Sequence, residues 1–137
     1  MSEENVETVL RAYAAFSEGD LTTVLQQLDP EVVSYTAAPL DPAEYRGHEG
    51  FLQWCDNWLS AFDEFTNEIE THVDTGEAVV LRVRQRATGA TSGVPVERTF
   101  WFVHLFSGGR IARIGIHAGE EQALQAAHAA AAALTDL

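Results

Sequence analysis

The segment from Phe100 to His117 constrains the fold of this chain more than any other part of the sequence. It predicts two long strands joined by a tight turn at residues 107–109, because glycine adopts the positive φ of such turns at little cost. The first of these strands is apolar on both faces, with Phe100, Phe102, His104 and Phe106 on one and Trp101, Val103 and Leu105 on the other. A strand buried on both sides needs a layer packed against each side. We therefore expect a curved sheet with a core or pocket on one face and a partner layer on the other.

Composition and charge exclude several classes of protein. The chain has 137 residues, which suits a single domain spanning residues 1–137 with a substantial core. Its net charge of −13 repels nucleic acid and anionic membrane surfaces, so we expect neither as a partner. The single cysteine, Cys55, excludes an internal disulfide and indicates a reducing compartment. The acidic N-terminus lacks a signal-peptide pattern and no apolar run is long enough to span a membrane, so we expect a cytoplasmic protein.

Helical spacing of apolar residues recurs in four segments. The pattern predicts a first helix from Val6 to Phe16, and then a short helix that Asp20 caps and that carries Leu21 to Leu28. A third helix spans Gly47–Phe62, with aromatic residues one turn apart. The tail, residues 118–137, contains an alanine-rich helix from Glu120 to Leu134 that we expect to be solvated or loosely docked, because alanine buries little area.

Strand patterns account for most of the remaining chain. We predict a strand at Val32–Ala37, a loop at residues 38–46, a strand carrying Phe65, Ile69 and Val73, a strand at Ala78–Thr88, and the hairpin described above. Helices that precede and flank a run of antiparallel strands are typical of the α+β class.

The orientation of the strand at 78–88 determines which of its side chains point to the concave, inner face of the sheet. If Ala90 pairs with Gly93, then Arg86 lies opposite Glu97 and Val83 opposite Phe100. This register joins opposite charges on one face and apolar groups on the other, so it is favoured. It places Arg82, Arg84 and Arg86 outside. The alternative register places the three arginines inside, where they would form an anion site.

Four motifs, in this order, carry a resemblance to a known family: Tyr13–Leu21, Leu28–Val33, Tyr45–Gly50 and Phe106–Ile111. With them the chain resembles the SnoaL-like branch of the nuclear transport factor 2 superfamily, which includes ketosteroid isomerase, limonene epoxide hydrolase and polyketide cyclases. The resemblance implies a cone: a strongly curved antiparallel sheet wrapped around helices, also called a cystatin-like α+β barrel, with a pocket at its open end. It also implies a homodimer through the outer sheet face, where Trp101, Val103 and Leu105 form an apolar strip.

Catalytic carboxylates of those relatives have no counterpart in this chain. The matching positions hold Thr36, Phe102 and Ile116, none of which can take a proton from carbon or water at neutral pH. We therefore expect neither ketosteroid isomerase nor limonene epoxide hydrolase activity. The isomerase's helix-one tyrosine falls at Ala12, and we place the neighbouring Tyr13 on a different face.

The predicted pocket is apolar, with few polar groups. Its expected lining is Phe16, Trp54, Trp58, Val83, Phe100, Phe102, Ile114 and Ile116, with Ser34, Thr36, Gln85 and His104 as the polar residues. His104 is the one candidate acid or base, because its ordinary pKa of about 6.5 suits that work. The other histidines are His48, His72, His117 and His128, and we expect them at the surface or at helix ends. No ligand pattern for a metal is present, Cys55 lacks an activating base, and we expect no cofactor.

Two functions remain open at this stage. One is an isomerase, cyclase or hydrolase type of enzyme on a small, mostly apolar organic substrate, using His104 with Gln85, Ser34 or Thr36. The other is a non-catalytic ligand-binding or regulatory dimer. Both need a concave apolar site with a few converging polar groups, which suits a small, neutral, apolar organic molecule.

Overall fold

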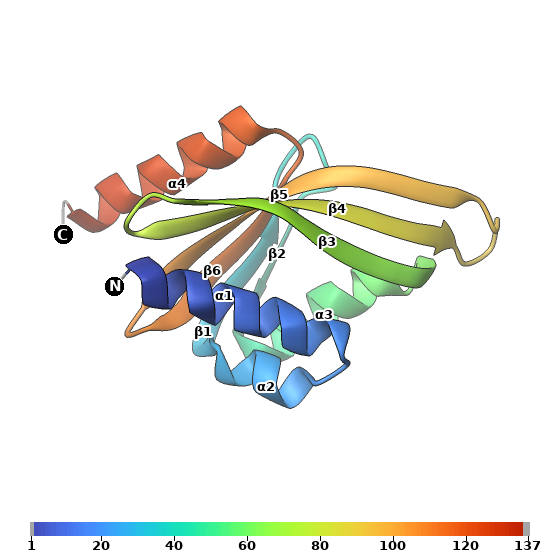
Figure 1. Ribbon diagram of the computed structural model, residues 1–137, viewed down its shortest axis with the longest axis horizontal. Coiled ribbons are helices and arrows are strands. Elements are labelled where there is room, and N and C mark those ends of the chain that lie inside the picture. The colour runs from blue at the N-terminus through green and yellow to red at the C-terminus, as the bar shows by residue number, and fades with distance from the viewer. Residues whose placement is uncertain (1, 136–137) are drawn as a thin grey trace.

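The structure, a computed structural model, describes residues 2–135 as a bent six-stranded sheet with helices on both faces (Figure 1). Its helices are α1 (Ser2–Ser17), α2 (Leu21–Gln26), α3 (Gly47–Leu59) and α4 (Glu120–Thr135). Its strands are β1 (Leu28–Thr36), β2 (Ala43–Arg46), β3 (Phe62–Asp74), β4 (Ala78–Gly89), β5 (Pro95–Ser107) and β6 (Arg110–His117). The predicted α+β fold, a curved sheet wrapped around helices, is confirmed. None of the helices within 2–135 is long and apolar enough to cross a membrane.

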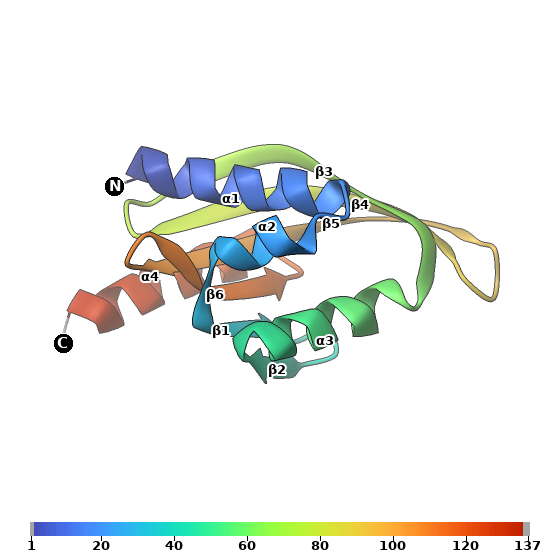
Figure 2. The same cartoon turned by 90° about the horizontal axis from the view of Figure 1, so that it is seen from below.

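Helices form one layer on each face of the sheet. Figures 1 and 2 show α1, α2 and α3 on the concave face and α4 on the convex face. The strand order is β2-β1-β6-β5-β4-β3, and every pair is antiparallel except β1 with β6, which is parallel. The main core lies on the concave side, where Val9 of α1 and Phe51 of α3 pack with Leu81 and Phe102 of the sheet.

The two hairpins that flank β5 have the predicted geometry. Gly108 and Gly109 form the two-residue turn between β5 and β6, with φ of 57° and 80°, values that favour glycine at both positions. Between β4 and β5, Arg86 pairs with Glu97 and Val83 pairs with Phe100. The predicted register is therefore confirmed.

This register places the arginines of β4 on the convex face. Arg82 and Arg84 both contact Glu70, at 3.3 and 3.0 Å, while Arg86 lies 3.4 Å from Glu97. These side chains are largely or partly exposed, so each ion pair adds little stability. The alternative of an arginine-lined anion site inside the sheet is excluded, because the buried face of β4 carries Val79, Leu81, Val83 and Gln85.

Helix α4 covers the apolar strip that the sequence assigned to a second copy of the chain. Ala123 and Ala127 of α4 are fully buried and pack on the convex face against Val80, Val103 and Leu105. The prediction of a solvated or loosely docked tail was therefore wrong for this part of α4. Small alanine side chains bring the helix backbone close to the sheet, so a helix with little apolar area still buries the strip.

Several boundaries differ from those predicted. Residues 38–46 were expected to be a loop, but they contain β2, which pairs with β1. Both prolines, Pro39 and Pro42, precede β2, so its N–H groups are free to pair. Helix α3 ends at Leu59 rather than Phe62. Val73 was expected on the same face as Ile69, but it is 46% exposed. A register shift in β3 between Ile69 and Thr71 turns the residues after it to the opposite face of the sheet.

The prediction that His117 lies at the surface or at a helix end was wrong, because this side chain is buried. It is 6% exposed, and its Nε2 lies 2.7 Å from the hydroxyl oxygen of Tyr35, which projects from the neighbouring strand β1. The Tyr35 ring reaches His117 by lying across Gly115, and a Cβ at position 115 would overlap this ring. Glycine at 115 is therefore required for the close approach of Tyr35 to β6.

We predict that Gly115→Ala lowers the free energy of unfolding by about 1–3 kcal/mol, the usual cost of overpacking. In the matched variant Gly119→Ala, the new Cβ would meet only the end of the Gln122 side chain, 3.6 Å away, so no overpacking is expected. Gly119 precedes α4 as its N-cap, so we expect a smaller loss, below about 1 kcal/mol, from the poorer cap. Urea unfolding measures both. Adding Tyr35→Leu to Gly115→Ala should recover part of the loss, and equal stability of the two alanine variants would contradict the packing described.

Candidate functional site

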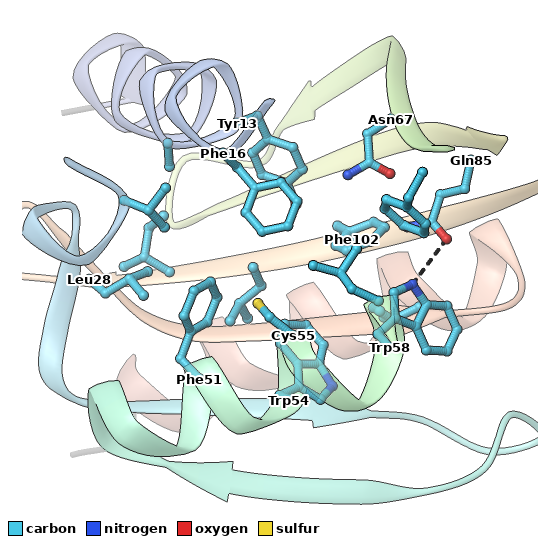
Figure 3. Close-up of a pocket in the computed structure, with 17 residues that line it drawn as sticks. Tyr13, Phe16, Leu28, Phe51, Trp54, Cys55, Trp58, Asn67, Gln85 and Phe102 are labelled. Carbon is cyan, nitrogen blue, oxygen red and sulfur yellow. Dashed lines mark hydrogen bonds between the residues drawn. The ribbon is translucent and has the colours of Figure 1, made fainter. Parts of the chain in front are cut away.

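A cavity lies between helices α1–α3 and the concave face of the sheet (Figure 3). Its volume is about 70 Å³, several times the roughly 10–15 Å³ that one water molecule needs. The lining consists of Ala12, Tyr13, Phe16, Val24, Leu28, Phe51, Trp54, Cys55, Trp58, Leu59, Phe65, Asn67, Gln85, Phe102, Ile111, Ile114 and Ile116. This lining contains no Asp, Glu, Lys, Arg or His, so the cavity is apolar and carries no formal charge.

The structure divides the predicted pocket residues into two groups. Those that line the cavity are Phe16, Trp54, Trp58, Gln85, Phe102, Ile114 and Ile116. Those outside the lining are Ser34, Thr36, Val83, Phe100 and His104, all of them buried. Side chains from α1 and α3 contact Thr36, Phe100 and His104 of this second group, which alternation along the strands alone does not reveal.

Two tryptophans on α3 make two of these contacts. Trp54 Nε1 donates a hydrogen bond to Thr36 Oγ1 at 3.0 Å, which occupies that hydroxyl. The Trp58 ring packs edge-on against Phe100, with the ring centroids 5.7 Å apart. Ser34 is fully buried, and its Oγ has no hydrogen-bond partner among residues 2–135. The contacts with Trp54 and Trp58 place Thr36 and Phe100 behind the lining.

Three polar side chains of the lining lie together at one end of the cavity. Figure 3 shows Trp58, Asn67 and Gln85 at this end, opposite Leu28 and Phe51. Trp58 Nε1 donates to Gln85 Oε1 at 3.2 Å. Because an indole nitrogen is only a donor, this bond fixes the orientation of the Gln85 amide and leaves its Nε2 as a donor.

Asn67 lines the cavity beside Gln85, its cross-strand partner, and the sequence analysis missed it. A signal was present, because Asn67 lies two residues from both Phe65 and Ile69 and alternation places all three on one face.

Tyr13 separates His104 from the cavity. The Tyr13 hydroxyl lies 3.0 Å from His104 Nε2, and His104 Nδ1 lies 2.9 Å from the carbonyl oxygen of Val79. A carbonyl only accepts, so Nδ1 carries the proton, and the Tyr13 hydroxyl donates to Nε2. The prediction that Tyr13 lies on a different face from Ala12 was wrong, because both residues fall within the buried stripe of α1 and line the cavity.

Burial keeps the ionisable groups at this site neutral. It lowers the pKa of His104 to about 4, although the bond to the Val79 carbonyl partly opposes this. Burial also raises the pKa of Tyr13 well above its ordinary value and raises that of the Cys55 thiol to about 12. At neutral pH the site therefore presents an uncharged imidazole, a phenol and a thiol, and both imidazole nitrogens already have partners.

The same region offers no cluster of metal ligands among the described residues. Within residues 2–135, no three His, Cys, Asp or Glu side chains are close enough to hold a metal ion. The cavity is also too small for a nucleotide-sized group. Its lining instead suits shape recognition, with two polar groups at one end: the Gln85 amide donor and Asn67 Oδ1, an acceptor without a partner among the described residues.

A model of the SnoaL-like domain family matches residues 9–114 of the chain. No functionally curated protein matches the sequence. Among solved structures, an NTF2-like protein of unknown function from Burkholderia pseudomallei is 22% identical, with 89% of this chain and 95% of that chain covered and a TM-score of 0.76.

Two further structures are similar over most of their length. One is a protein from Jannaschia sp. CCS1 that is assigned as a SnoaL-like polyketide cyclase, 18% identical, with 92% of each chain covered and a TM-score of 0.76. The other is TerC, co-crystallised with polyporic acid, 16% identical, with 89% of this chain and 96% of that chain covered and a TM-score of 0.76. At these identities the likeness establishes the fold alone.

Burial of His104 predicts a specific pH dependence of stability. Its pKa is about 4 in the folded chain and about 6.5 when unfolded, so the unfolded chain binds more protons between these values. Stability should therefore fall as the pH drops from about 6.5 towards 4. We expect the native chain to lose about 1–2 kcal/mol more than His104→Gln between about pH 6.5 and 5, measured by urea unfolding.

All other ionisable groups are the same in both proteins, so their contributions cancel in this comparison. If His104→Gln does not fold, an NMR titration of the native His104 ring gives the same answer and should show it neutral at pH 5. Equal losses in the two proteins, or a charged His104 ring at pH 5, would contradict the buried neutral imidazole.

Proposed function

Because the chain belongs to the SnoaL-like domain family, we propose that its concave cavity binds a small, neutral, mostly apolar organic molecule. The observation that carries the proposal is the lining, in which aromatic and aliphatic side chains surround a space without a formally charged residue. An unpaired charge on the ligand would be buried there at high cost, so a neutral molecule is favoured. The volume of about 70 Å³ is smaller than the roughly 150 Å³ of an engineered cavity that holds benzene, so a one-ring ligand enters only if lining side chains move.

The polar end of the cavity favours a ligand with an acceptor oxygen. Trp58 holds the Gln85 oxygen, so the Gln85 amide offers N–H groups to whatever lies in the cavity. A ketone, ether or similar oxygen would complement these groups, whereas a hydrocarbon would leave them without a partner. A hydroxyl on the ligand would also donate to Asn67 Oδ1, which is buried without a partner among the described residues. We therefore propose that the ligand places its oxygen at the Trp58, Asn67 and Gln85 end and its hydrocarbon part towards Phe51.

The absence of carboxylates from the described lining favours binding over proton-transfer catalysis. The positions matching the relatives' catalytic carboxylates hold Thr36, Phe102 and Ile116. His104 lies behind Tyr13 with both ring nitrogens occupied, so its proposed role as a base has little support. A cyclase-type reaction that needs only a shaped apolar enclosure is compatible with this cavity, and TerC, co-crystallised with polyporic acid, gives a structural parallel for an organic ligand.

We predict that acetophenone binds in this cavity with a dissociation constant on the order of 1 mM or tighter, given typical affinities per ligand atom. Trp54 and Trp58 line the cavity and Trp101 lies on the opposite face, so the indole N–H resonances of the three tryptophans report the location. We expect those of Trp54 and Trp58 to shift on titration and that of Trp101 to stay unchanged. Ethylbenzene, which has the same shape without the oxygen, should bind more weakly.

Two matched variants separate cavity binding from surface binding. Ala12→Leu fills the cavity from α1 and should abolish the shifts, whereas Ala14→Leu, exposed on the same helix, should leave them intact. Gln85→Leu should remove the preference for acetophenone over ethylbenzene. Binding that survives Ala12→Leu, or that shifts the Trp101 resonance alone, would refute the proposed site.

We also keep the homodimer and the cytoplasmic location as proposals. The dimer was inferred from an exposed apolar strip on the outer sheet face. Helix α4 covers Val103 and Leu105 of this strip, so the strip gives less support for a dimer. Light scattering at micromolar concentration tests it directly. The proposal expects a mass near twice 15.0 kDa, and a mass near 15.0 kDa would end it.

A further inference from the structure

A second hollow lies on the convex face, between α4 and the sheet. Its lining consists of Tyr35, Val103, Leu105, Arg113, His117, Ala126 and Ala129, and its volume is about 440 Å³. None of these residues lines the concave cavity. The two spaces therefore lie on opposite faces of the same strands. We call this second space the convex cleft.

A hydrogen-bonded pair forms the polar part of the convex cleft. Tyr35 and His117 meet edge-on, with their rings at 84° and the hydroxyl oxygen 2.7 Å from Nε2. If Tyr35 donates, His117 keeps a proton on Nδ1, and if His117 donates, Tyr35 keeps its hydroxyl proton. In either case the pair retains one unused donor.

Among the described residues that line the cleft, the only formal charge is the guanidinium of Arg113. Arg113 lies over the Tyr35 ring, with its central carbon 4.5 Å from the ring centroid. Burial lowers the pKa of His117 and raises that of Tyr35, so both stay neutral near pH 7. The lining contains no acidic residue, and Glu44, the nearest carboxylate partner of Arg113, is 3.8 Å away in a half-exposed pair of little strength.

Close packing holds the Tyr35 ring at the centre of this cluster. Gly115 provides the space in which the Tyr35 ring lies, and Tyr35 in turn positions Arg113 and His117. Val103, Leu105 and the alanines of α4 form an apolar wall beside the donors.

We propose that the convex cleft binds a small organic monocarboxylate. Its carboxylate would lie at Arg113 and the spare donor of the Tyr35–His117 pair, and its hydrocarbon part against Val103, Leu105 and α4. A guanidinium with an adjacent neutral donor matches the two oxygens of a carboxylate. A single cation in a chain of net charge −13 does not suit a polyanion such as a phosphate ester.

Benzoate and its neutral counterpart benzamide test this proposal on the full chain by backbone amide NMR. Benzoate should shift the resonances of Val103, Leu105, Arg113 and His117 in a saturable manner, and benzamide should bind at least roughly tenfold more weakly. Arg113→Gln should lower benzoate affinity at least roughly tenfold. Arg110→Gln removes the same charge from the same strand outside the cleft and should change nothing.

Two further variants complete the test. Tyr35→Phe, which removes the hydroxyl and keeps the ring, should weaken benzoate binding severalfold. Ala12→Leu fills the concave cavity and should leave benzoate binding intact. The proposals for the convex cleft and for the concave cavity are therefore tested independently. The proposal is overturned if benzoate gives no saturable shift at roughly 10 mM, if benzamide binds equally well, or if Arg113→Gln and Arg110→Gln have the same effect.

Discussion

The pairing register of β4 with β5 determines which side chains face each layer of this protein. It sets Val83 opposite Phe100 on the concave face and Arg86 opposite Glu97 on the convex face. A slip of one residue would exchange the faces of a whole strand, placing arginines in the core and valines among ion pairs. The cavity, the arginine–glutamate pairs and the docking surface for α4 all depend on this one pairing. Cross-strand charge pairing and burial of the apolar face favour the same register, so it is strongly specified.

Much of this arrangement could be predicted from the sequence, because the signals are local. Two glycines set the β5–β6 turn, and Asp20 caps α2 by accepting from the Thr23 backbone at 3.1 Å, as its position predicts. The layer over Val103 and Leu105 was assigned to the wrong element, a second copy in place of α4. An apolar strip in a sequence indicates that another element covers it, but it does not identify that element. An alanine-rich helix gives only a weak burial signal.

The site was harder to predict, because it depends on the rotation of helices over the sheet. Alternation correctly placed His104 on the inward face of β5, but not the Tyr13 hydroxyl 3.0 Å from its ring. That contact joins residues 91 positions apart, and a rotation of α1 by one residue would remove it. Likewise, nothing local shows that Trp54 occupies the Thr36 hydroxyl or that Trp58 orients the Gln85 amide. These contacts change a row of candidate polar groups into a neutral enclosure with donors at one end.

The most direct test of this account is a crystal structure of the chain with acetophenone. The account predicts the aromatic ring between α1 and α3, within the cavity, and the ketone oxygen within hydrogen-bond distance of Gln85 Nε2. The Trp58–Gln85 hydrogen bond should persist, because it orients the amide. Acetophenone bound outside the cavity, or inside it with its oxygen towards Phe51, would contradict the account.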